Sequence, residues 1–300
     1  MKRHVGLLMI LLLGLALVAG CSSAEVDDPK EVVIGSKPMT EQYILGEMLT
    51  ALIEENTDIT VVRQFGIGGG TSNLHPAVLS GEIDMYPEYS GTGWLFVLSQ
   101  DGFPERDELY RRTKEMYLEE FDIVWFEAYG FDNTFTLALD ETVASSLGLQ
   151  TFSDLAGVSG TMSFGAEFDF FERDDGFDAL TETYGMTFDT VRELDIGLKY
   201  QAIAADEVDV INAFSTDGML KEFGLTILED DLGFFPTYLA GTIIRAETLE
   251  QYPELEDVLR MLEGAISTEE MIDLNYRVDV LGEEPIDVAL NFLRTNNLLD

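Results

Sequence analysis

The sequence predicts an α/β protein made of two similar lobes, each a sheet flanked by helices. Apolar runs of strand length alternate with helical patterns along residues 31–300, which is typical of parallel sheets packed between helices. In addition, the segment 77–93 recurs as 202–218, 125 positions later. The alternation predicts the fold class, and the recurrence predicts the two lobes.

The first predicted elements are short and regularly spaced. Residues 31–34 form an apolar strand. A helix is expected from Thr40, as its cap, to about residue 56, because apolar side chains recur on one face. Residues 59–65 alternate as in a strand, and a glycine-rich turn then leads into a short helix over 72–79. The strand 83–86 follows this helix.

The later elements continue the same pattern. Residues 107–120 predict a charged helix, and 136–139 and 161–164 have the composition of strands. From residue 248 onward the chain has a mostly helical pattern. The sequence therefore predicts strands and helices along most of the mature chain and a mostly helical end.

The internal recurrence also predicts where a ligand binds. Four residues of the first copy, Glu82, Asp84, Ser90 and Gly93, recur as Glu207, Asp209, Ser215 and Gly218. Tyr89 and Phe214 take the same place just beyond a strand. Ligands of open α/β sheets bind beyond the carboxyl ends of the strands, so we expect these two rings to face each other across a cleft. A chance match of short α/β units is the alternative.

The first thirty residues predict export. Lys2 and Arg3 precede an uncharged apolar run over 5–18, which is too short to span a bilayer comfortably. The run ends in Val-Ala-Gly-Cys, which resembles the lipobox of bacterial lipoproteins. The resemblance implies a signal peptide over 1–20, lipid attached to Cys21, a flexible tether over 21–30 and an extracytoplasmic protein held at the cell membrane. A plain secretory signal with an incidental cysteine is the alternative.

Composition excludes several classes of function. With 17 basic and 57 acidic residues the net charge is −40, which would repel nucleic acid and favours a soluble monomer. One cysteine and two histidines leave no disulfide framework and no Cys- or His-rich metal site. Neither a Walker A sequence nor a Gly-x-Ser-x-Gly elbow occurs, and Thr71 interrupts the one glycine-rich candidate for a dinucleotide site. We therefore expect neither an enzyme nor a cofactor.

Two kinds of residue suggest a small-molecule ligand. Lys37 and Arg173 are scarce cations in loops that follow strands, although a surface ion pair with one of the many acids is the alternative. Aromatic residues also occur in loops. They are Tyr89, Phe135, Phe214 and Tyr238. Aromatic residues usually belong to the core, but four rings around a cleft would surround a quaternary ammonium group by cation–π attraction.

Several motifs resemble those of osmoprotectant-binding lipoproteins, the substrate-binding components of ABC importers for glycine betaine, choline and carnitine. They are 34–42 (IGSKPMTEQ), 81–92 (GEIDMYPEYSGT), 214–218 (FSTDG) and 234–238 (FFPTY). The resemblance covers about 31–299 and implies a two-lobe periplasmic-binding-protein fold with two hinge crossings. On this chain, lobe I would hold 31–135 and 240–300, and lobe II would hold 136–239. The crossings would lie near 135–140 and 238–242.

The resemblance also implies site residues and a role. An aromatic cage would be formed by Tyr89, Phe135, Phe214 and Tyr238. Arg173 would hold a ligand carboxylate, assisted by Lys37 and Thr92. Phe135 and Phe214 stand where the family usually has tyrosine. The protein would capture glycine betaine or a related compatible solute and deliver it to a membrane permease. Choline, carnitine, another small cation or an amino acid is the alternative ligand, and a cell-surface enzyme is a more distant alternative.

Overall fold

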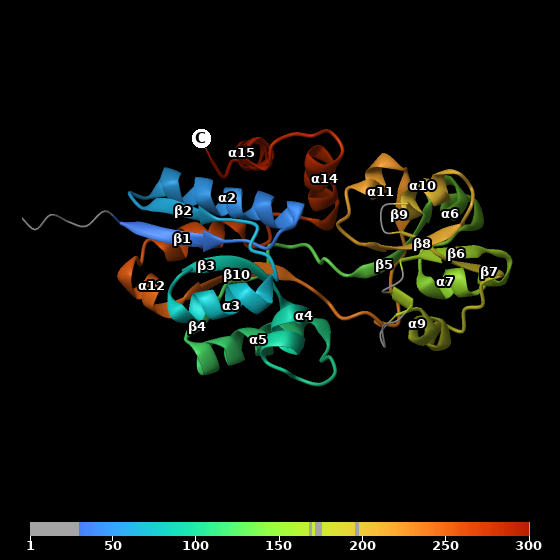
Figure 1. Ribbon diagram of the computed structural model, residues 1–300, viewed down its shortest axis with the longest axis horizontal. Coiled ribbons are helices and arrows are strands. Elements are labelled where there is room, and N and C mark those ends of the chain that lie inside the picture. Colours follow the sequence, from blue (N-terminus) through green and yellow to red (C-terminus); the bar gives the residue numbers. More distant parts are fainter. Residues whose placement is uncertain (1–29, 168–169, 172–175, 196–197, 300) are drawn as a thin grey trace, which may run out of the picture. The chain divides into compact units, whose positions relative to one another are not determined.

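The computed structural model describes residues 30–299 except 168–169, 172–175 and 196–197 (Figure 1). Two five-stranded sheets organise the described chain. We call the first sheet with its helices lobe I and the second sheet with its helices lobe II. Strands and helices alternate in both lobes, as the sequence predicts. The expected α/β fold with two lobes is confirmed.

The sheet of lobe I has the strand order β2-β1-β3-β10-β4. Its strands are β1 Glu31–Gly35, β2 Thr60–Gln64, β3 Met85–Tyr89, β4 Ile123–Trp125 and β10 Ala240–Arg245. β1 runs parallel to β2 and β3, whereas β10 runs antiparallel to β3 and β4. β10 enters this sheet from far along the chain and becomes the neighbour of the central strand.

The sheet of lobe II has the equivalent order β7-β6-β8-β5-β9. Its strands are β5 Phe135–Asp140, β6 Ser163–Ala166, β7 Thr190–Glu193, β8 Val210–Phe214 and β9 Leu225–Ile227. β6 runs parallel to β7 and β8, and β5 runs antiparallel to β8 and β9. The central strands β3 and β8 occupy identical places in the sequence recurrence, which confirms the prediction of two similar units.

The prediction of purely parallel sheets is wrong in one respect. β5 and β10 are the strands that follow a crossing from the other lobe, and both are antiparallel to their neighbours. Each crossing arrives at the edge where the neighbouring strand ends. Ala240, for example, starts β10 opposite Tyr89, the last residue of β3. The new strand must therefore run back through the sheet in the opposite direction.

Helices cover both faces of the lobe I sheet, as Figure 1 shows. The helical segments are α2 Thr40–Asn56, α3 Thr71–Ser80, α4 Ser90–Thr92, η1 Gly93–Val97, α5 Arg106–Phe121, α12 Ala246–Gln251, α13 Leu255–Leu259, η3 Arg260–Leu262, α14 Thr268–Asp279 and α15 Pro285–Thr295. One apolar core joins the sheet to α2, α14 and α15, and another joins it to α3 and α5. The cap of α2 is Met39 instead of Thr40, whose hydroxyl donates to Asp279 Oδ1 at 2.5 Å.

Lobe II has shorter helices around its sheet. They are α6 Glu141–Leu147, α7 Phe152–Ala156, η2 Ser159–Thr161, α9 Phe177–Tyr184, α10 Lys199–Ala204 and α11 Met219–Glu222. The Asp140 side chain caps α6, and Thr151 forms a capping box with Asp154 at the start of α7. None of the helices in the described part of the chain is long and apolar enough to cross a membrane.

Two segments, 126–134 and 228–239, connect the sheets. They lie next to each other, because the Asn133 amide donates to the Tyr238 carbonyl at 3.2 Å and Asp132 forms a bridge with Leu239. The crossings therefore lie mostly before the expected positions 135–140 and 238–242, which largely belong to β5 and β10. The physical reason is burial: apolar residues such as Leu137 and Ile243 place these stretches inside the sheets.

Candidate ligand-binding site

Six of the seven ligand contacts expected from the sequence line one pocket of about 300 Å³. Its lining consists of Lys37, Met39, Tyr89, Thr92, Asn133, Phe135, Phe214 and Tyr238. These residues come from both lobes and from both crossings. The seventh expected contact, Arg173, and the expected lipidation residue, Cys21, lie outside the described residues.

The lobe II side of this pocket is a pair of stacked phenyl rings. Phe135 starts β5 and lies opposite Phe214 at the end of β8, so the sheet register brings the two together. Their ring centroids are 4.7 Å apart and their planes differ by 28°. Phe135 also packs against Phe170 and Phe235. Phe214 keeps 38% of its surface exposed, and this open ring is available to a ligand.

The lobe I side is held by hydrogen bonds as well as by packing. Tyr89 ends β3, is only 3% exposed, and donates its hydroxyl to Glu41 Oε1 at 2.6 Å. The backbone amide of Tyr238 donates to Asp132 Oδ1 at 2.6 Å, which fixes the second crossing beside the first. A Cβ at Gly91 would lie 2.7 Å from the Tyr238 ring. Glycine therefore lets Tyr238 pack over the start of α4.

Lys37 is a buried cation, so the alternative of a surface ion pair does not apply. Its ammonium contacts the carboxylate of Glu88, which has no exposed surface, and lies 4.7 Å from the Tyr89 ring centroid. Glu88 also accepts from Thr71 Oγ1 at 2.7 Å and from the Tyr86 hydroxyl at 3.0 Å. A buried carboxylate with several donors balances the lysine charge and fixes it beside the Tyr89 ring.

Glu41 is a second buried carboxylate behind the pocket. It is 3% exposed and accepts from Asn133 Nδ2 at 3.0 Å, in addition to the Tyr89 hydroxyl. Burial raises the pKa of this carboxyl, although its hydrogen bonds act in the opposite direction. Sequence reasoning identified neither Glu41 nor Glu88 as a site residue. The one available signal was their position inside the two motifs that resemble the osmoprotectant-binding family.

A second pocket of about 340 Å³ adjoins the first and shares Met39, Asn133 and Phe214 with it. We call its remaining lining, together with Asn133, the acidic annex. The annex residues are Thr40, Glu41, Asn133, Thr216, Asp217, Gly218, Asn275 and Asp279. Burial also raises the pKa of Asp279. The sequence singled out none of these residues as a ligand contact.

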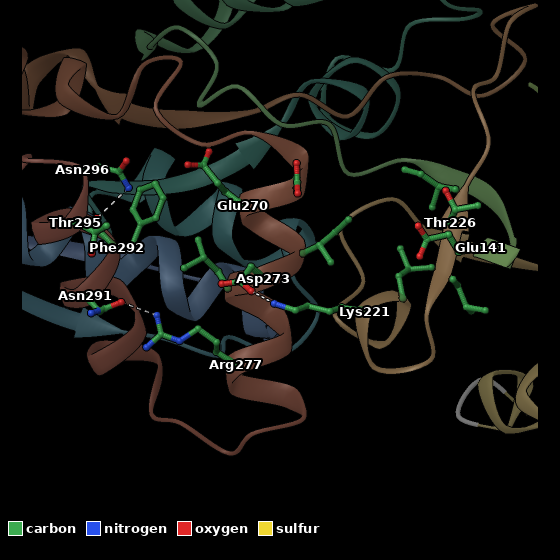
Figure 2. A pocket seen from close by; sticks show the side chains of 16 residues that line it. Glu141, Lys221, Thr226, Glu270, Asp273, Arg277, Asn291, Phe292, Thr295 and Asn296 are labelled. Carbon is green, nitrogen blue, oxygen red and sulfur yellow. Dashed lines mark hydrogen bonds and ion pairs between the residues drawn. The ribbon is translucent and has the colours of Figure 1, made fainter. Parts of the chain in front are cut away.

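A larger cavity, of about 740 Å³, lies elsewhere (Figure 2). It is lined mainly by α14 and α15 on one side and by α11 and β9 on the other. Figure 2 shows Lys221 paired with Asp273, and Arg277 donating to Asn291. The cations that line this cavity are already paired, and none of the expected ligand contacts is among its lining residues.

No group of three His, Cys, Asp or Glu residues able to hold a metal occurs within the described ranges.

Comparison with known proteins identifies the family. Residues 30–295 match the model of the substrate binding domain of ABC-type glycine betaine transport systems. The chain is 42% identical, over 97% of its length, to the ergothioneine transport permease/ergothioneine binding protein EgtU of Helicobacter pylori, and spans 53% of that longer protein. It is 33% identical to the carnitine transport binding protein OpuCC of Listeria monocytogenes, covering all of this chain and 98% of the other.

Solved structures agree with this assignment. A glycine betaine/carnitine/choline ABC transporter structure superimposes with a TM-score of 0.84 and 33% identity, covering 90% of this chain and all of the other. Apo YehZ from Escherichia coli gives a TM-score of 0.80 with 28% identity, covering 88% and 98%. Proteins of this family bind solutes for ABC transporters and are not enzymes. The chain belongs to the OpuAC family, the substrate-binding domains of ABC-type glycine betaine transport systems.

Proposed function

We propose that the pocket between Tyr89 and Phe214 captures a trimethylammonium betaine, either glycine betaine or a larger relative. The observation that carries the proposal is that four aromatic residues from four separate segments line one pocket with a buried lysine. Family membership already implies a small-molecule ligand, a membrane permease as partner and an extracytoplasmic place of action. In this proposal the protein acts as a monomer, and its two lobes, each built on one of the two sheets, close over the ligand.

The aromatic rings suit the ammonium end of such a ligand. A trimethylammonium group is weakly hydrated and spreads its charge over its methyl groups, so ring faces attract it at low desolvation cost. Each good contact contributes about 0.5–2 kcal/mol. Phe135 and Phe214 lack the hydroxyl that the family usually has, but a phenyl ring keeps the negative face that attracts a cation. The loss of two hydroxyls therefore leaves the cation site intact.

The polar side of the pocket suits the carboxylate end. Lys37 and Thr92 line the same pocket as the rings and offer an ammonium and a hydroxyl as donors. We assign the main carboxylate contact to Arg173 on the strength of the sequence motif, because a guanidinium binds a carboxylate with two parallel hydrogen bonds. Cation and anion of a betaine would then be bound at the same time.

A second candidate ligand is ergothioneine. The relative that is 42% identical carries this ligand in its name, whereas relatives at 33% identity are named for carnitine and glycine betaine. All three compounds combine a trimethylammonium group with a carboxylate. Ergothioneine also carries an imidazole-2-thione ring, and the annex beside the cage offers room for a substituent.

A matched pair of compounds tests the cage. β-Alanine betaine and 4,4-dimethylpentanoate, in which carbon replaces the ammonium nitrogen, have the same shape and the same carboxylate, but only the betaine carries a positive charge. We expect calorimetry to show the betaine binding at least about tenfold more tightly, or about 1.4 kcal/mol. Phe214→Leu should reduce the difference in affinity between the two compounds, because leucine keeps much of the apolar volume but lacks the aromatic ring. Equal affinity for the two compounds would refute the cage.

We further propose that Cys21 anchors the mature protein to the membrane through lipid. The support is the sequence ending Val-Ala-Gly-Cys, where the chain's single cysteine stands at the position that lipoproteins modify. We expect Cys21→Ser to release the protein from membranes without changing its unfolding midpoint, because Cys21 precedes β1, the first strand of lobe I, by ten positions in the sequence. Lipid labelling and membrane fractionation check this, and unchanged membrane retention would contradict it.

A further inference from the structure

Outside the two crossings, the lobes also touch where α11 of lobe II meets α14 of lobe I. Asn275 Nδ2, on α14, donates to the Thr216 carbonyl at 2.8 Å. Ile272, also on α14, packs against the apolar core of lobe II that surrounds β8 and α10. Figure 2 shows Lys221 of α11 paired with Asp273 of α14. A hydrogen bond, an apolar contact and an ion pair therefore join the lobes at this place.

Gly218 is the point of closest approach in this contact. It directly precedes α11 and has a φ of −61° and a ψ of −24°, which are ordinary right-handed helical values. Its backbone does not require glycine, because alanine adopts this conformation more readily. The requirement comes from lobe I: a Cβ at Gly218 would lie 2.5 Å from the Tyr276 nitrogen and 2.7 Å from the Tyr276 Cα. Both are backbone atoms of α14, so no side-chain rotation relieves the clash.

The contact lies between two cavities that are each lined by both lobes. One is the acidic annex, to which Gly218 contributes from lobe II and Asn275 from lobe I. The other is the cavity of Figure 2, to which Lys221 contributes from lobe II and Asp273 from lobe I. The contact between α11 and α14 is therefore narrow. It sets the distance between the lobes at one place and leaves space on either side.

Residues 214–218 connect this contact to the aromatic cage. Phe214 lines the cage, and Ser215 binds the first crossing through the Asp132 carbonyl and the Thr134 amide. The Thr216 carbonyl then accepts from α14, and Gly218 meets the α14 backbone. One short segment thus carries both the ring that lines the pocket and the glycine that touches lobe I. The position of α14 therefore determines where Phe214 stands relative to lobe I.

We propose that the α11–α14 contact positions Phe214 against the lobe I half of the pocket, with Gly218 as the positioning residue. The inference rests on the proposed function for the identity of the ligand. Contact and two-lobe pocket occur together in this structure, so the contact shifts the ligand-free lobes toward the arrangement in which the cage is assembled. Ligand binding then completes closure. Loss of the contact raises the apparent dissociation constant in inverse proportion to the assembled fraction.

Gly218→Ala is the sharpest test, because it adds one methyl group and suits the helical backbone. We expect calorimetry to show glycine betaine and carnitine binding at least about tenfold more weakly, as for an assembled fraction of about one tenth. Gly160→Ala, also in lobe II, is the matched control. A Cβ at Gly160 would meet only Thr187 of the same lobe, at 3.6 Å, and affinity should change by less than about twofold. Unchanged or tighter binding in Gly218→Ala would overturn the proposal.

The distance between the lobes is measured without any ligand. Spin labels on cysteines introduced at Leu79 of α3 and Leu147 of α6, both exposed, report this distance in Cys21→Ser protein. We expect Gly218→Ala to lengthen and broaden the distance distribution, and Gly160→Ala to leave it unchanged. A residue that merely supports the fold would lower the unfolding midpoint without moving this distance. An unchanged distribution in ligand-free Gly218→Ala therefore also refutes the positioning role.

The two proposals fail in different ways. If no trimethylammonium compound binds the unmodified protein, the proposed function is wrong, and the lobe distance still tests the contact. If betaines bind the unmodified protein and Gly218→Ala equally well, the pocket stands and the positioning proposal alone fails. Where Gly218→Ala does not fold, Asn275→Leu takes its place in both measurements, because it removes the donor to the Thr216 carbonyl. We expect it to weaken binding about threefold and to lengthen the same distance, and no change in either would count against the contact.

Discussion

Lobe I and lobe II repeat one strand order but hold their pocket residues by different forces. In lobe I, Tyr89 is almost completely buried and its hydroxyl is bound by Glu41. In lobe II the equivalent Phe214 is 38% exposed and stacks on Phe135. The lobe I half is fixed by directional hydrogen bonds, whereas the lobe II half is an apolar ring surface. A repeated backbone can therefore present a hydrogen-bonded ring on one side of the pocket and a stacked apolar ring on the other.

The residues that do recur between the lobes serve the framework. Asp84 Oδ2 accepts from the Val33 amide at 2.8 Å, and its counterpart Asp209 accepts from the Ser163 amide at 2.7 Å. Each carboxylate thus ties the central strand to the parallel strand beside it. The recurrence marks positions that connect the elements of a lobe, whereas the pocket residues Tyr89 and Phe214 differ at equivalent positions.

Each lobe also buries one lysine beside a glutamate. Lys37 contacts Glu88 in lobe I, and Lys199 Nζ lies 2.9 Å from Glu167 Oε2 in lobe II. Glu88 has no exposed surface, whereas the Glu167 side chain is 14% exposed. Lys199 has a second acceptor, Asn212 Oδ1 at 3.3 Å. Lys37 therefore depends more strongly on Glu88 than Lys199 depends on Glu167.

The largest expected effect breaks these pairs. Glu88→Gln leaves the Lys37 ammonium buried without a counter-charge and should destabilise the protein by about 3–5 kcal/mol. Glu167→Gln should cost less, because Lys199 keeps Asn212 and the site reaches water. Urea unfolding measures both free energies of unfolding. If Glu167→Gln lowers the free energy of unfolding as much as Glu88→Gln does, the two lysine–glutamate pairs do not differ in this way.

A smaller effect is expected at the two serines that hold the crossings. Ser90 Oγ donates to the Thr237 carbonyl at 3.2 Å and accepts from the Leu239 amide at 3.1 Å. Ser215 Oγ makes the same pair of bonds to the other crossing, with the Asp132 carbonyl at 2.6 Å and the Thr134 amide at 3.0 Å. The recurring serine therefore clamps, in each lobe, the segment that arrives from the other.

Alanine at either serine leaves a backbone amide and a backbone carbonyl, each buried or partly buried, with fewer partners. We expect Ser90→Ala and Ser215→Ala to lower the free energy of unfolding by about 1–3 kcal/mol each. Ser80→Ala, which removes an exposed hydroxyl at a helix end, is the control and should change little. If only one of the two serine variants is destabilised, the two serines do not hold the crossings in equivalent ways.

Much of this arrangement was predictable from local signals. The recurrence placed β3 and β8 correctly, and the sequence motifs identified six residues that line one pocket. The direction of β5 and β10 was not predictable, because it depends on where a long connection enters a sheet. The local sequence of a strand does not determine where that connection enters the sheet.

The buried polar residues were also not predictable from the sequence. Among 57 acidic residues, nothing in composition or spacing separates Glu41 and Glu88 from solvated ones. Their importance comes from burial, which only the packing of α2 against the sheet and α14 creates. The same holds for Asn275, which lies in a helix whose remaining pattern is amphipathic and ordinary.

The smallest expected effect is on the pH dependence of stability, where the lobes differ in sign. Burial raises the pKa of Glu41 in lobe I. Hydrogen bonds from the Thr142 side chain and the Val143 amide lower the pKa of Asp140, which caps α6 in lobe II. A raised pKa means that folded protein binds the proton more strongly than unfolded protein. The Glu41 contribution therefore declines as pH rises above its ordinary value of 4.5 and passes through the folded pKa.

Asp140 behaves in the opposite way: its stabilising contribution is present above its ordinary value of 3.8 and is lost as pH falls through the lowered pKa. The free energy of unfolding of Glu41→Gln should increase relative to wild type as pH rises. Asp140→Asn keeps a capping side chain, and its free energy of unfolding should fall less than that of wild type as pH becomes acidic. Urea unfolding from about pH 3 to pH 8 checks this. Differences from wild type cancel the shared repulsion of the acidic surface, so two variants that both parallel wild type at every pH would contradict the assignment.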